Sequence, residues 1–418
     1  MKTLLFVSSC LFHSLLASPS FNPEICLTES EGRTFPKTTP KTHHLKALNS
    51  TTNNILHLTR QATASGLVAR QISSIVEQDG QAAYTAEVVI DNTTFNLLVD
   101  TGSSDTWVTS LNTTCFDPFT EEACTFPTHL SVPEDEKWLE PFYTSYVDKS
   151  NVTGGLIQRP LSIAGIAIQD QVIGLVDEAF LGRTDGSLDG LLGLGLGAIG
   201  TPPYLPVFGS MIADELIERN RFSIALLGTA DVDERDSGLL AFGGIPESIE
   251  LTSEWGIAPI LTDAFYAIEV DGFMFQGAQE ITLSLDQRIA VMDSGTFLTR
   301  LPLPVADAIW DLLPGTPTDE CTGKSNEKCK GDLGYWKVPC DGRVPSFSVV
   351  IGGVAFPISE ENLIVSLAED TCISAIIPQE GDLPAILGFT FMKNVVVLHD
   401  FTDLQEPIMG VATYEFSQ

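Results

Sequence analysis

The sequence predicts a mainly β protein made of two similar β lobes with a few short helices. Past residue 70, short apolar runs are bounded by Gly, Asn, Asp and Ser, which is typical of strands joined by turns. A four-residue motif and its downstream partner also occur twice, at nearly the same spacing. Because strands do not alternate with long helices, the pattern argues against a doubly wound α/β fold.

The individual elements are expected where apolar residues cluster. The expected strands are residues 84–90, 95–99, 161–168, 239–242, 289–292 and 395–398. Helical periodicity is confined to residues 206–219 and 304–313, so helices are expected to contribute little.

The first 18 residues have the features of a secretory signal peptide. Lys2 is followed by an apolar run over residues 4–17 and then by Ser18, a combination that favours a signal peptide over a buried helix. No later run reaches about 18 apolar residues, and residues 409–418 carry no hydrophobic tail. We therefore expect a soluble, secreted, extracellular protein without a membrane anchor.

Charge is strongly segregated along the chain. The 22 Lys and Arg side chains against 55 Asp and Glu give a formal charge of −33, which makes nucleic acid an improbable partner. Residues 1–70 carry +4, whereas residues 71–418 carry −37. The basic leader is either a flexible tail or a prosegment held on the acidic body until acid weakens the attraction. We favour a prosegment over residues 19–70, with maturation after Arg70, although any bond from about residue 60 to 81 fits.

The cysteine content indicates disulfides rather than a metal site. Of the eight Cys, Cys10 and Cys26 fall in the signal peptide and the prosegment, and six remain, which allows 15 pairings. A zinc site is the competing interpretation, but no C-x-x-C occurs and the body contains only His129 and His399. No metal or other cofactor is expected.

The duplicated motif carries the chemistry. It reads Asp100-Thr101-Gly102-Ser103 and Asp293-Ser294-Gly295-Thr296, each directly after an apolar run. Downstream partners are Leu191-Leu192-Gly193 and Ile386-Leu387-Gly388, which place Gly193 and Gly388 at 93 and 95 positions from their aspartates. This repetition predicts lobes over residues 71–255 and 256–418, each contributing one Asp to a shared cleft. Two carboxylates that close cannot both ionise, so one holds a proton while the other acts as a base.

With these motifs, the chain from about residue 84 to its end resembles the pepsin-like aspartic endopeptidases of the secreted fungal type. The resemblance extends to residues 99–108, 189–195 and 242–245. It implies a bilobal pepsin-like fold with a central active-site cleft. It also implies that Asp100 and Asp293 are catalytic and activate a water to hydrolyse, in acid, peptide bonds between bulky apolar residues of an extended polypeptide.

The same resemblance implies roles for the motif's other residues. Ser103 and Thr296 are expected to hydrogen-bond the outer carboxylate oxygens, and Thr101 and Ser294 to cross-brace the two loops. Gly102 and Gly295 are expected to let the backbone approach the carboxylates, although an ordinary turn is the alternative. The protein is expected to be a monomer made as a zymogen and inhibited by its own prosegment, with Lys41 at the aspartates and Lys37 and Lys46 as rivals.

Residues 142–154 resemble the β-hairpin flap of the family. Tyr146 is expected to be the flap tyrosine bonded to Trp107, with a core tyrosine as the structural alternative. The flap departs from the family pattern, because Val147 and Lys149 replace two glycines around Asp148. A tip without glycine cannot adopt positive φ at low cost, which leaves the subsite preference open.

Covalent modifications are expected at two kinds of position. By resemblance, Cys115 pairs with Cys124 and Cys340 with Cys372, which leaves Cys321–Cys329 as a local link. Three N-glycosylation sequons begin at Asn92, Asn112 and Asn151, the last within the proposed flap.

Two other classes of protein compete with the protease interpretation. One is a pepsin-fold binding protein with weak or lost catalysis, which need not keep both aspartates with their Ser and Thr supports but which the altered flap leaves open. The other is a glycosidase with paired carboxylates, which also works in acid but does not require the glycine-flanked duplicate motif.

Overall fold

The computed structural model describes residues 48, 51–52, 54–63, 81–116, 123–146, 150–181, 188–227, 238–275, 281–313, 315–317, 336–341, 346–368, 371–379 and 383–416. All of these residues belong to one compact unit, residues 40–418, and the fold below is that of this unit. The described residues are mostly in strands, with four short α-helices, which confirms the predicted fold class.

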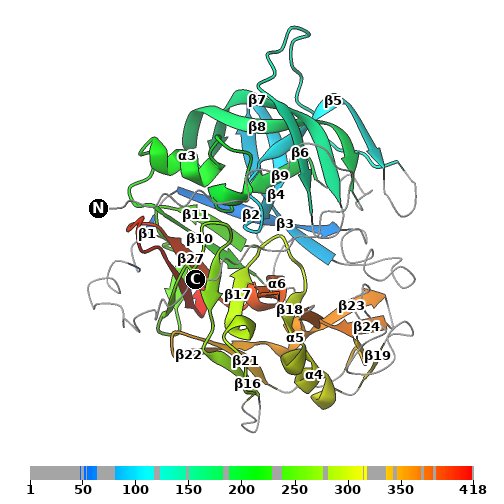
Figure 1. The fold of residues 1–418 in the computed structure, drawn as a ribbon, viewed down its shortest axis with the longest axis vertical. Helices are drawn as coiled ribbons and strands as arrows, with labels where there is room; N and C mark the ends of the chain where they lie inside the picture. Colours follow the sequence, from blue (N-terminus) through cyan, green and yellow to red (C-terminus); the bar gives the residue numbers. More distant parts are fainter. Residues whose placement is uncertain are drawn as a thin grey trace, which may run out of the picture. The chain divides into compact units, whose positions relative to one another are not determined.

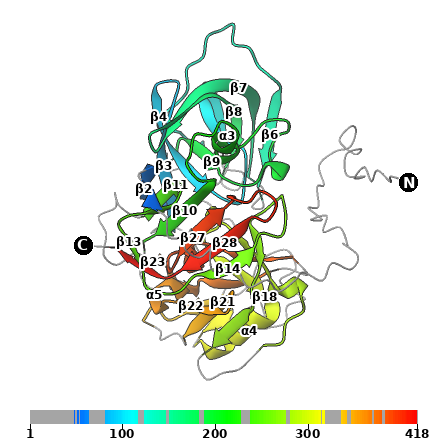
Figure 2. The ribbon, with the colours of Figure 1, turned by 90° about the vertical axis from the view of Figure 1, so that its left-hand side faces the viewer.

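One sheet of 13 strands forms the first lobe and continues into the centre of this unit (Figures 1 and 2). In spatial order its strands are β14 (Gly256–Pro259), β28 (Ile408–Ala412), β27 (Val396–Asp400), β10 (Arg221–Leu226), β11 (Gly238–Phe242), β2 (Asn54–Thr63), β3 (Gln81–Ile90), β4 (Thr93–Asp100), β9 (Gly190–Gly193), β5 (Trp107–Phe116), β8 (Ile166–Phe180), β7 (Asn151–Ile163) and β6 (Pro141–Ser145). Strands from both halves of the sequence therefore meet in its central part.

The second lobe is built from smaller sheets. A five-stranded sheet has the order β15 (Ala267–Glu269), β17 (Ile289–Met292), β26 (Ala385–Leu387), β18 (Thr299–Pro302) and β25 (Ile376–Gln379). The other two are β16 (Gly272–Phe275), β21 (Phe347–Ile351) and β22 (Val354–Ile358), and β19 (Thr316–Pro317), β20 (Trp336–Val338), β24 (Thr371–Ser374) and β23 (Ile364–Ala368). Two short pairs complete the described sheets: β1 (Thr51–Thr52) with β12 (Ile245–Pro246), and β13 (Ile249–Leu251) with β29 (Tyr414–Phe416).

The α-helices are short, and the last of them is buried between the two lobes. They are α3 (Val207–Ala213), α4 (Leu303–Leu312), α5 (Glu360–Leu363) and α6 (Phe389–Met392). α3 and α4 lie where helical periodicity predicted them, but α3 ends at Ala213, six residues before the predicted end. The backbone leaves the helical region there, because Glu215 adopts φ +53°.

The predicted strand over residues 161–168 is wrong as a single element. β7 ends at Ile163, β8 begins at Ile166, and these two residues pair across a two-residue turn. Ala164 and Gly165 have φ values of +52° and +77°, as the mirror-image turns of tight hairpins require. Apolar residues on both arms of the hairpin produced one continuous apolar run, which concealed the turn.

Part of the expected prosegment is a strand of the large sheet. β2 lies between β11 and β3, with Leu56 opposite Leu240 and Thr59 opposite Thr85. Leu58 is completely buried within it. Electrostatic attraction is therefore not the only interaction that holds this segment, because backbone pairing and apolar burial also hold it.

A buried aromatic group fills the centre of the unit. His399 on β27 stacks on Phe222 at 4.2 Å and meets Tyr266 edge-on at 4.3 Å. The histidine is fully buried and neither ring nitrogen has a hydrogen-bond partner, so burial lowers its pKa to about 3. Within the described ranges, no helix combines the length and apolar character needed to cross a membrane.

Candidate active site

Asp100 is positioned by the buried end of β4. The three residues before it, Leu97, Leu98 and Val99, are apolar and buried, and the aspartate itself is only 6% exposed. The backbone N–H of Gly102 donates to its Oδ1 at 2.8 Å, and Ser103 Oγ donates to its Oδ2 at 2.5 Å. Both carboxylate oxygens are therefore held by the turn that follows the aspartate.

Asp293 is held in the same way in the second lobe. It follows β17 directly, and its Oδ1 accepts from the N–H of Gly295 at 2.8 Å while its Oδ2 accepts from Thr296 Oγ1 at 2.6 Å. The two distances match those at Asp100 to within 0.1 Å. The duplicated sequence has thus produced a duplicated carboxylate cradle.

The two cradles face each other. A methyl group on Gly102 would lie 2.6 Å from Asp293 Oδ1, and one on Gly295 would overlap Asp100 Oδ1. Each loop therefore approaches the opposite carboxylate more closely than any side chain would allow. The absence of a Cβ at these two positions is what lets the aspartates meet.

Burial and the nearby second carboxylate together raise the pKa of Asp100. Burial, and then the negative charge of Asp293, raise the pKa of Asp100 from 3.8 to about 7, against the lowering effect of the hydrogen bonds from Ser103 and Gly102. Asp100 therefore keeps its proton well above the pH at which an ordinary aspartate loses it. An adjacent pair that shares one proton supplies an acid and a base at the same place.

Thr101 and Ser294 tie the two loops together. The N–H of Thr101 donates to Ser294 Oγ at 3.1 Å, and the N–H of Ser294 donates to Thr101 Oγ1 at 2.9 Å. Each hydroxyl then donates across the interface to a carbonyl, Thr101 to Met292 at 3.0 Å and Ser294 to Val99 at 2.9 Å. All four bonds are buried, so the separation of the two lobes is fixed at this point.

The downstream partner motifs support the loops from behind. β9 runs parallel to β4 with Gly193 beside Asp100, and β26 runs parallel to β17 with Leu387 beside Met292. The N–H of Leu194 donates to Asp100 O at 2.8 Å, and the N–H of Phe389 donates to Thr296 O at 2.9 Å. Ser103, the counterpart of Thr296, likewise accepts through its carbonyl from the N–H of Gly195 at 2.7 Å, so the matched spacing in the sequence reflects matched contacts.

The expected flap tyrosine contacts the expected tryptophan. Trp107 Nε1 donates to Tyr146 Oη at 2.7 Å, and β6 pairs with β7 up to Ser145 and Asn151. Beyond that pair, the N–H of Tyr146 donates to Ser150 O at 2.8 Å. The tip residues Val147, Asp148 and Lys149 lie outside the described residues.

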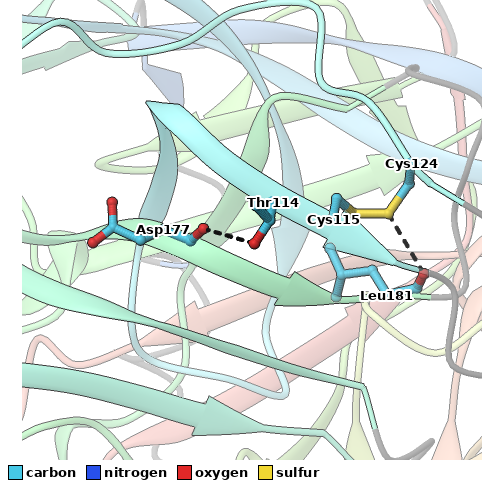
Figure 3. Close-up of a disulfide and its surroundings, with 5 residues drawn as sticks. All are labelled: Thr114, Cys115, Cys124, Asp177 and Leu181. Carbon is cyan, nitrogen blue, oxygen red and sulfur yellow. Dashed lines mark hydrogen bonds between the residues drawn. A yellow bond between two sulfur atoms is a disulfide. The ribbon is translucent and has the colours of Figure 1, made fainter.

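Two of the three expected disulfides are present. Cys115–Cys124 joins the end of β5 to the following segment, where Cys124 Sγ also faces Leu181 O (Figure 3). Cys340–Cys372 links residues 32 positions apart in the second lobe. Outside the described part of the chain lie Cys321, Cys329, Cys10, Cys26, Lys37, Lys41, Lys46 and Arg70.

Sequence reasoning missed two residues that position the site. Asp189 is buried, and its carboxylate accepts from the N–H of Asn96 at 2.7 Å and from that of Thr128 at 2.8 Å. Tyr266, from the second lobe, donates to Leu194 O in the first at 2.6 Å, directly behind Asp100. Asp189 could have been found from its place at the head of the 189–195 motif, but nothing in the sequence marks Tyr266.

The described side chains include no cluster of three or more His, Cys, Asp or Glu arranged to bind a metal ion. The pair of aspartates has a different arrangement, in which each carboxylate accepts two hydrogen bonds from its own loop. Such a pair can activate a water molecule by removing one of its protons.

Comparisons with known proteins agree with this geometry. The family model for eukaryotic aspartyl proteases matches residues 83–413. A probable aspartic-type endopeptidase of Aspergillus fumigatus is 28% identical over 352 residues, which cover 76% of each chain. An aspartic protease of Phaffia rhodozyma is 27% identical over 78% of this chain and 76% of its own, and cathepsin E of Aquarana catesbeiana is 26% identical over 77% of each.

Proposed function

The chain belongs to the eukaryotic aspartyl protease family and is an aspartic-type endopeptidase, and on this premise we propose that it is a secreted, monomeric zymogen whose mature form cleaves polypeptides in acid. The observation that carries the proposal is the facing pair of cradles around Asp100 and Asp293. Because burial raises the pKa of Asp100 to about 7, the singly protonated pair is the form present in mildly acidic solution.

In the proposed reaction, a water between the two carboxylates attacks the peptide carbonyl. The ionised aspartate removes a proton from the water, and the protonated one donates its proton to the carbonyl oxygen. Asp100, which is the more buried, is the proton donor in this scheme and Asp293 is the base. The tetrahedral intermediate then collapses with protonation of the leaving amine, and no covalent bond to the enzyme forms.

We propose that the substrate is an extended polypeptide with bulky apolar residues at the scissile bond. An apolar cluster adjoins Asp100 and the flap strands, and it consists of Leu98, Trp107, Cys115, Cys124, Phe142, Val152, Leu156, Val176, Ala179 and Leu191, with Phe126 and Tyr146 at its margin. Trp107 and Tyr146 sit where this cluster meets the flap. A substrate apolar side chain that contacts the partly buried Phe126 and Tyr146 at this margin loses contact with water, which favours binding.

The zymogen proposal rests on charge and on β2. Residues 1–70 carry +4 against −37 for the remainder, and acid weakens that attraction as carboxylates are protonated. The pairing of β2 with β11 and β3 is not weakened in this way, because backbone hydrogen bonds and apolar burial do not titrate. Acid is therefore expected to weaken only the charge attraction, and release of the basic segment after cleavage near Arg70 also requires β2 to leave the sheet.

The proposal is tested by hydrolysis of an unfolded protein from pH 2.5 to 7 after acid treatment. Wild-type protein is compared with Asp293→Asn, and a statine-type transition-state inhibitor is added to a parallel sample. Activity confined to acid and abolished by both the substitution and the inhibitor is expected. A folded, processed protein that stays inactive at every pH would instead identify a binding protein on a protease scaffold.

A further inference from the structure

Strands β5, β8, β7 and β6 at one end of the large sheet, called the flap sheet below, carry exposed aromatic side chains on their outer face. Phe116 is 45% exposed, Phe180 is 39% exposed and Tyr143 is 63% exposed. They come from β5, β8 and β6, while the residues next to them in sequence, Cys115, Ala179 and Phe142, are buried on the opposite face. Exposed aromatic side chains gathered on one sheet face mark a surface that something covers.

Strand register places these aromatics in two neighbouring rows. Phe116 is opposite Phe180 across the β5–β8 pairing, and Phe180 is opposite Asn151 across the β8–β7 pairing. Tyr143 is opposite Thr153, which is two residues from Asn151 on the same face of β7. Residues directly opposite each other have their Cβ atoms about 5 Å apart and project from the same face. Asn151 therefore emerges beside Phe180 and diagonally from Tyr143.

Asn151 begins the sequon Asn151-Val152-Thr153. Val152 is fully buried, which confirms that Asn151 and Thr153 project from the outer face with the aromatics. The attachment point of a glycan thus lies within one side-chain length of two exposed aromatic rings. The first N-acetylglucosamine has an apolar face of C–H groups, which fits the negative face of an aromatic ring.

We propose that Asn151 is N-glycosylated and that the first sugar of this glycan packs on Phe180 and Tyr143, covering the aromatic face of the flap sheet. The group that covers this face is thus a sugar attached covalently to Asn151 of the same molecule. A substrate polypeptide or a second copy of the chain would also bury aromatics, but neither explains why a sequon is in register with them. The inference rests on the proposed secretion, because N-glycans are added in the secretory pathway.

The site's occupancy and its effect are measured on full-length chain secreted from a eukaryotic host. Peptide mapping with peptide N-glycosidase F in heavy-oxygen water identifies which asparagines carried glycans. Thr153→Val removes the sequon and leaves Asn151 in place, while Thr153→Ser keeps the sequon as the matched control. Thr94→Val removes the sequon at Asn92, which lies in a turn opposite no exposed aromatic.

We expect Asn151 to be occupied in the wild type and in Thr153→Ser. Thr153→Val should raise the binding of a hydrophobic dye at least about threefold and lower Tm by roughly 2 °C, whereas Thr94→Val should change neither. In a Phe180→Thr background the additional Thr153→Val change should have no effect on dye binding. Endoglycosidase H trims wild-type glycans to the first sugar, which is the one proposed to cover the aromatics, so dye binding should stay unchanged. This experiment needs no variant and therefore still applies if a variant fails to fold.

Three results would overturn the proposal. The first is an unmodified Asn151 in protein that is glycosylated at Asn92. The second is an equal rise in dye binding when Thr153→Val is made with and without Phe180. The third is a gain in cleavage of large proteins, but not of short peptides, on loss of the glycan, which would assign the face to substrate. Acid proteolysis by wild-type protein is scored separately, so failure of the glycan proposal is distinguishable from failure of the aspartate pair.

Discussion

The two aspartate loops belong to lobes that are built differently, yet they hold their carboxylates alike. Around Asp100 the supporting strands belong to a sheet of 13 strands, and around Asp293 to one of five. The bonds from the turn are nevertheless 2.8 and 2.5 Å in the first lobe and 2.8 and 2.6 Å in the second. The two turns therefore hold their carboxylates with nearly the same geometry, although the sheets that support them differ in size.

The loops differ immediately after the motif. Ser104 Oγ donates to Leu196 O at 2.5 Å, and the next residue, Asp105, accepts from the N–H of Thr201 at 3.0 Å. At the position equivalent to Ser104, Phe297 packs on Phe389, with ring centroids 6.2 Å apart. The first loop is therefore fixed by buried polar contacts and the second by apolar packing. Asp100 is also the more buried aspartate, so the two halves of the pair are not equivalent.

The largest effect is expected from adding a methyl group between the carboxylates. Gly102→Ala and Gly295→Ala each place a Cβ against the opposite aspartate, which should reduce kcat/KM about 10²-fold or more because the pair is pushed apart. Gly197→Ala is the matched control, since the nearest atom to its Cβ is 3.7 Å away. Equal activities for all three variants would show that the close approach is unimportant.

A smaller effect, and an asymmetric one, is expected from removing the outer hydrogen bonds. Ser103→Ala should lower kcat/KM about 10- to 100-fold, because a part-buried hydrogen bond that orients the reacting carboxyl group is lost. It should also raise the pKa of Asp100 further, since Ser103 lowers it, and so move the alkaline limb of the rate profile upward. Thr296→Val should cost less, because Asp293 is half-buried and water can replace the hydroxyl. Identical losses would show that the two cradles are equivalent after all.

Stability should fall as pH rises because of Asp100. Its pKa is raised from 3.8 when unfolded to about 7 when folded, so between these values the folded protein binds more protons than the unfolded one. The free energy of unfolding should therefore be highest below pH 4 and decline toward pH 7, by at most about 1.4 kcal/mol per pH unit from this group. Asp100→Asn should show a shallower decline in thermal melts followed by circular dichroism. A slope identical to that of the wild type would assign the effect to the charge of −37 on residues 71–418.

The smallest effects are expected at the brace between the lobes. Thr101→Val leaves the buried N–H of Ser294 without an acceptor, which should lower the free energy of unfolding by about 1–3 kcal/mol. Thr101→Ser retains the hydroxyl and removes one buried methyl group, so it should cost less than about 1 kcal/mol. Denaturant titration at pH 4 compares the variants. If Thr101→Ser lowered the free energy of unfolding as much as Thr101→Val, the loss would be due to changed packing and not to the missing hydrogen bond.

The fold and the aspartate pair were predictable because their determinants are local. A buried strand, an Asp and a glycine turn are consecutive in the sequence, and their repetition revealed the two lobes. The hairpin at Ala164 and Gly165 was hidden because apolar residues continue on both sides of it. Tyr266 and Asp189 could not be assigned because their partners, Leu194, Asn96 and Thr128, are brought to them only by the fold.

The role of β2 shows the same limit. Composition separates residues 1–70 from the acidic body, but it gives no indication that residues 54–63 pair with two strands of that body. Strand pairing depends on which edges the rest of the chain leaves open, and this is a property of the complete sheet. Charge alone therefore predicts only an electrostatic attraction between this segment and the body, whereas in the structure residues 54–63 are a strand of the large sheet.

The most direct test of the central claim is the pH dependence of kcat/KM for the processed enzyme on a short peptide, with folding checked at each pH. If Asp100 and Asp293 share one proton, the profile should be bell-shaped, with an alkaline limb that follows the pKa of Asp100, about 7. Asp100→Asn and Asp293→Asn should both be inactive throughout. Undiminished activity at pH 8, or an active Asp293→Asn variant, would contradict the shared proton and with it the proposed mechanism.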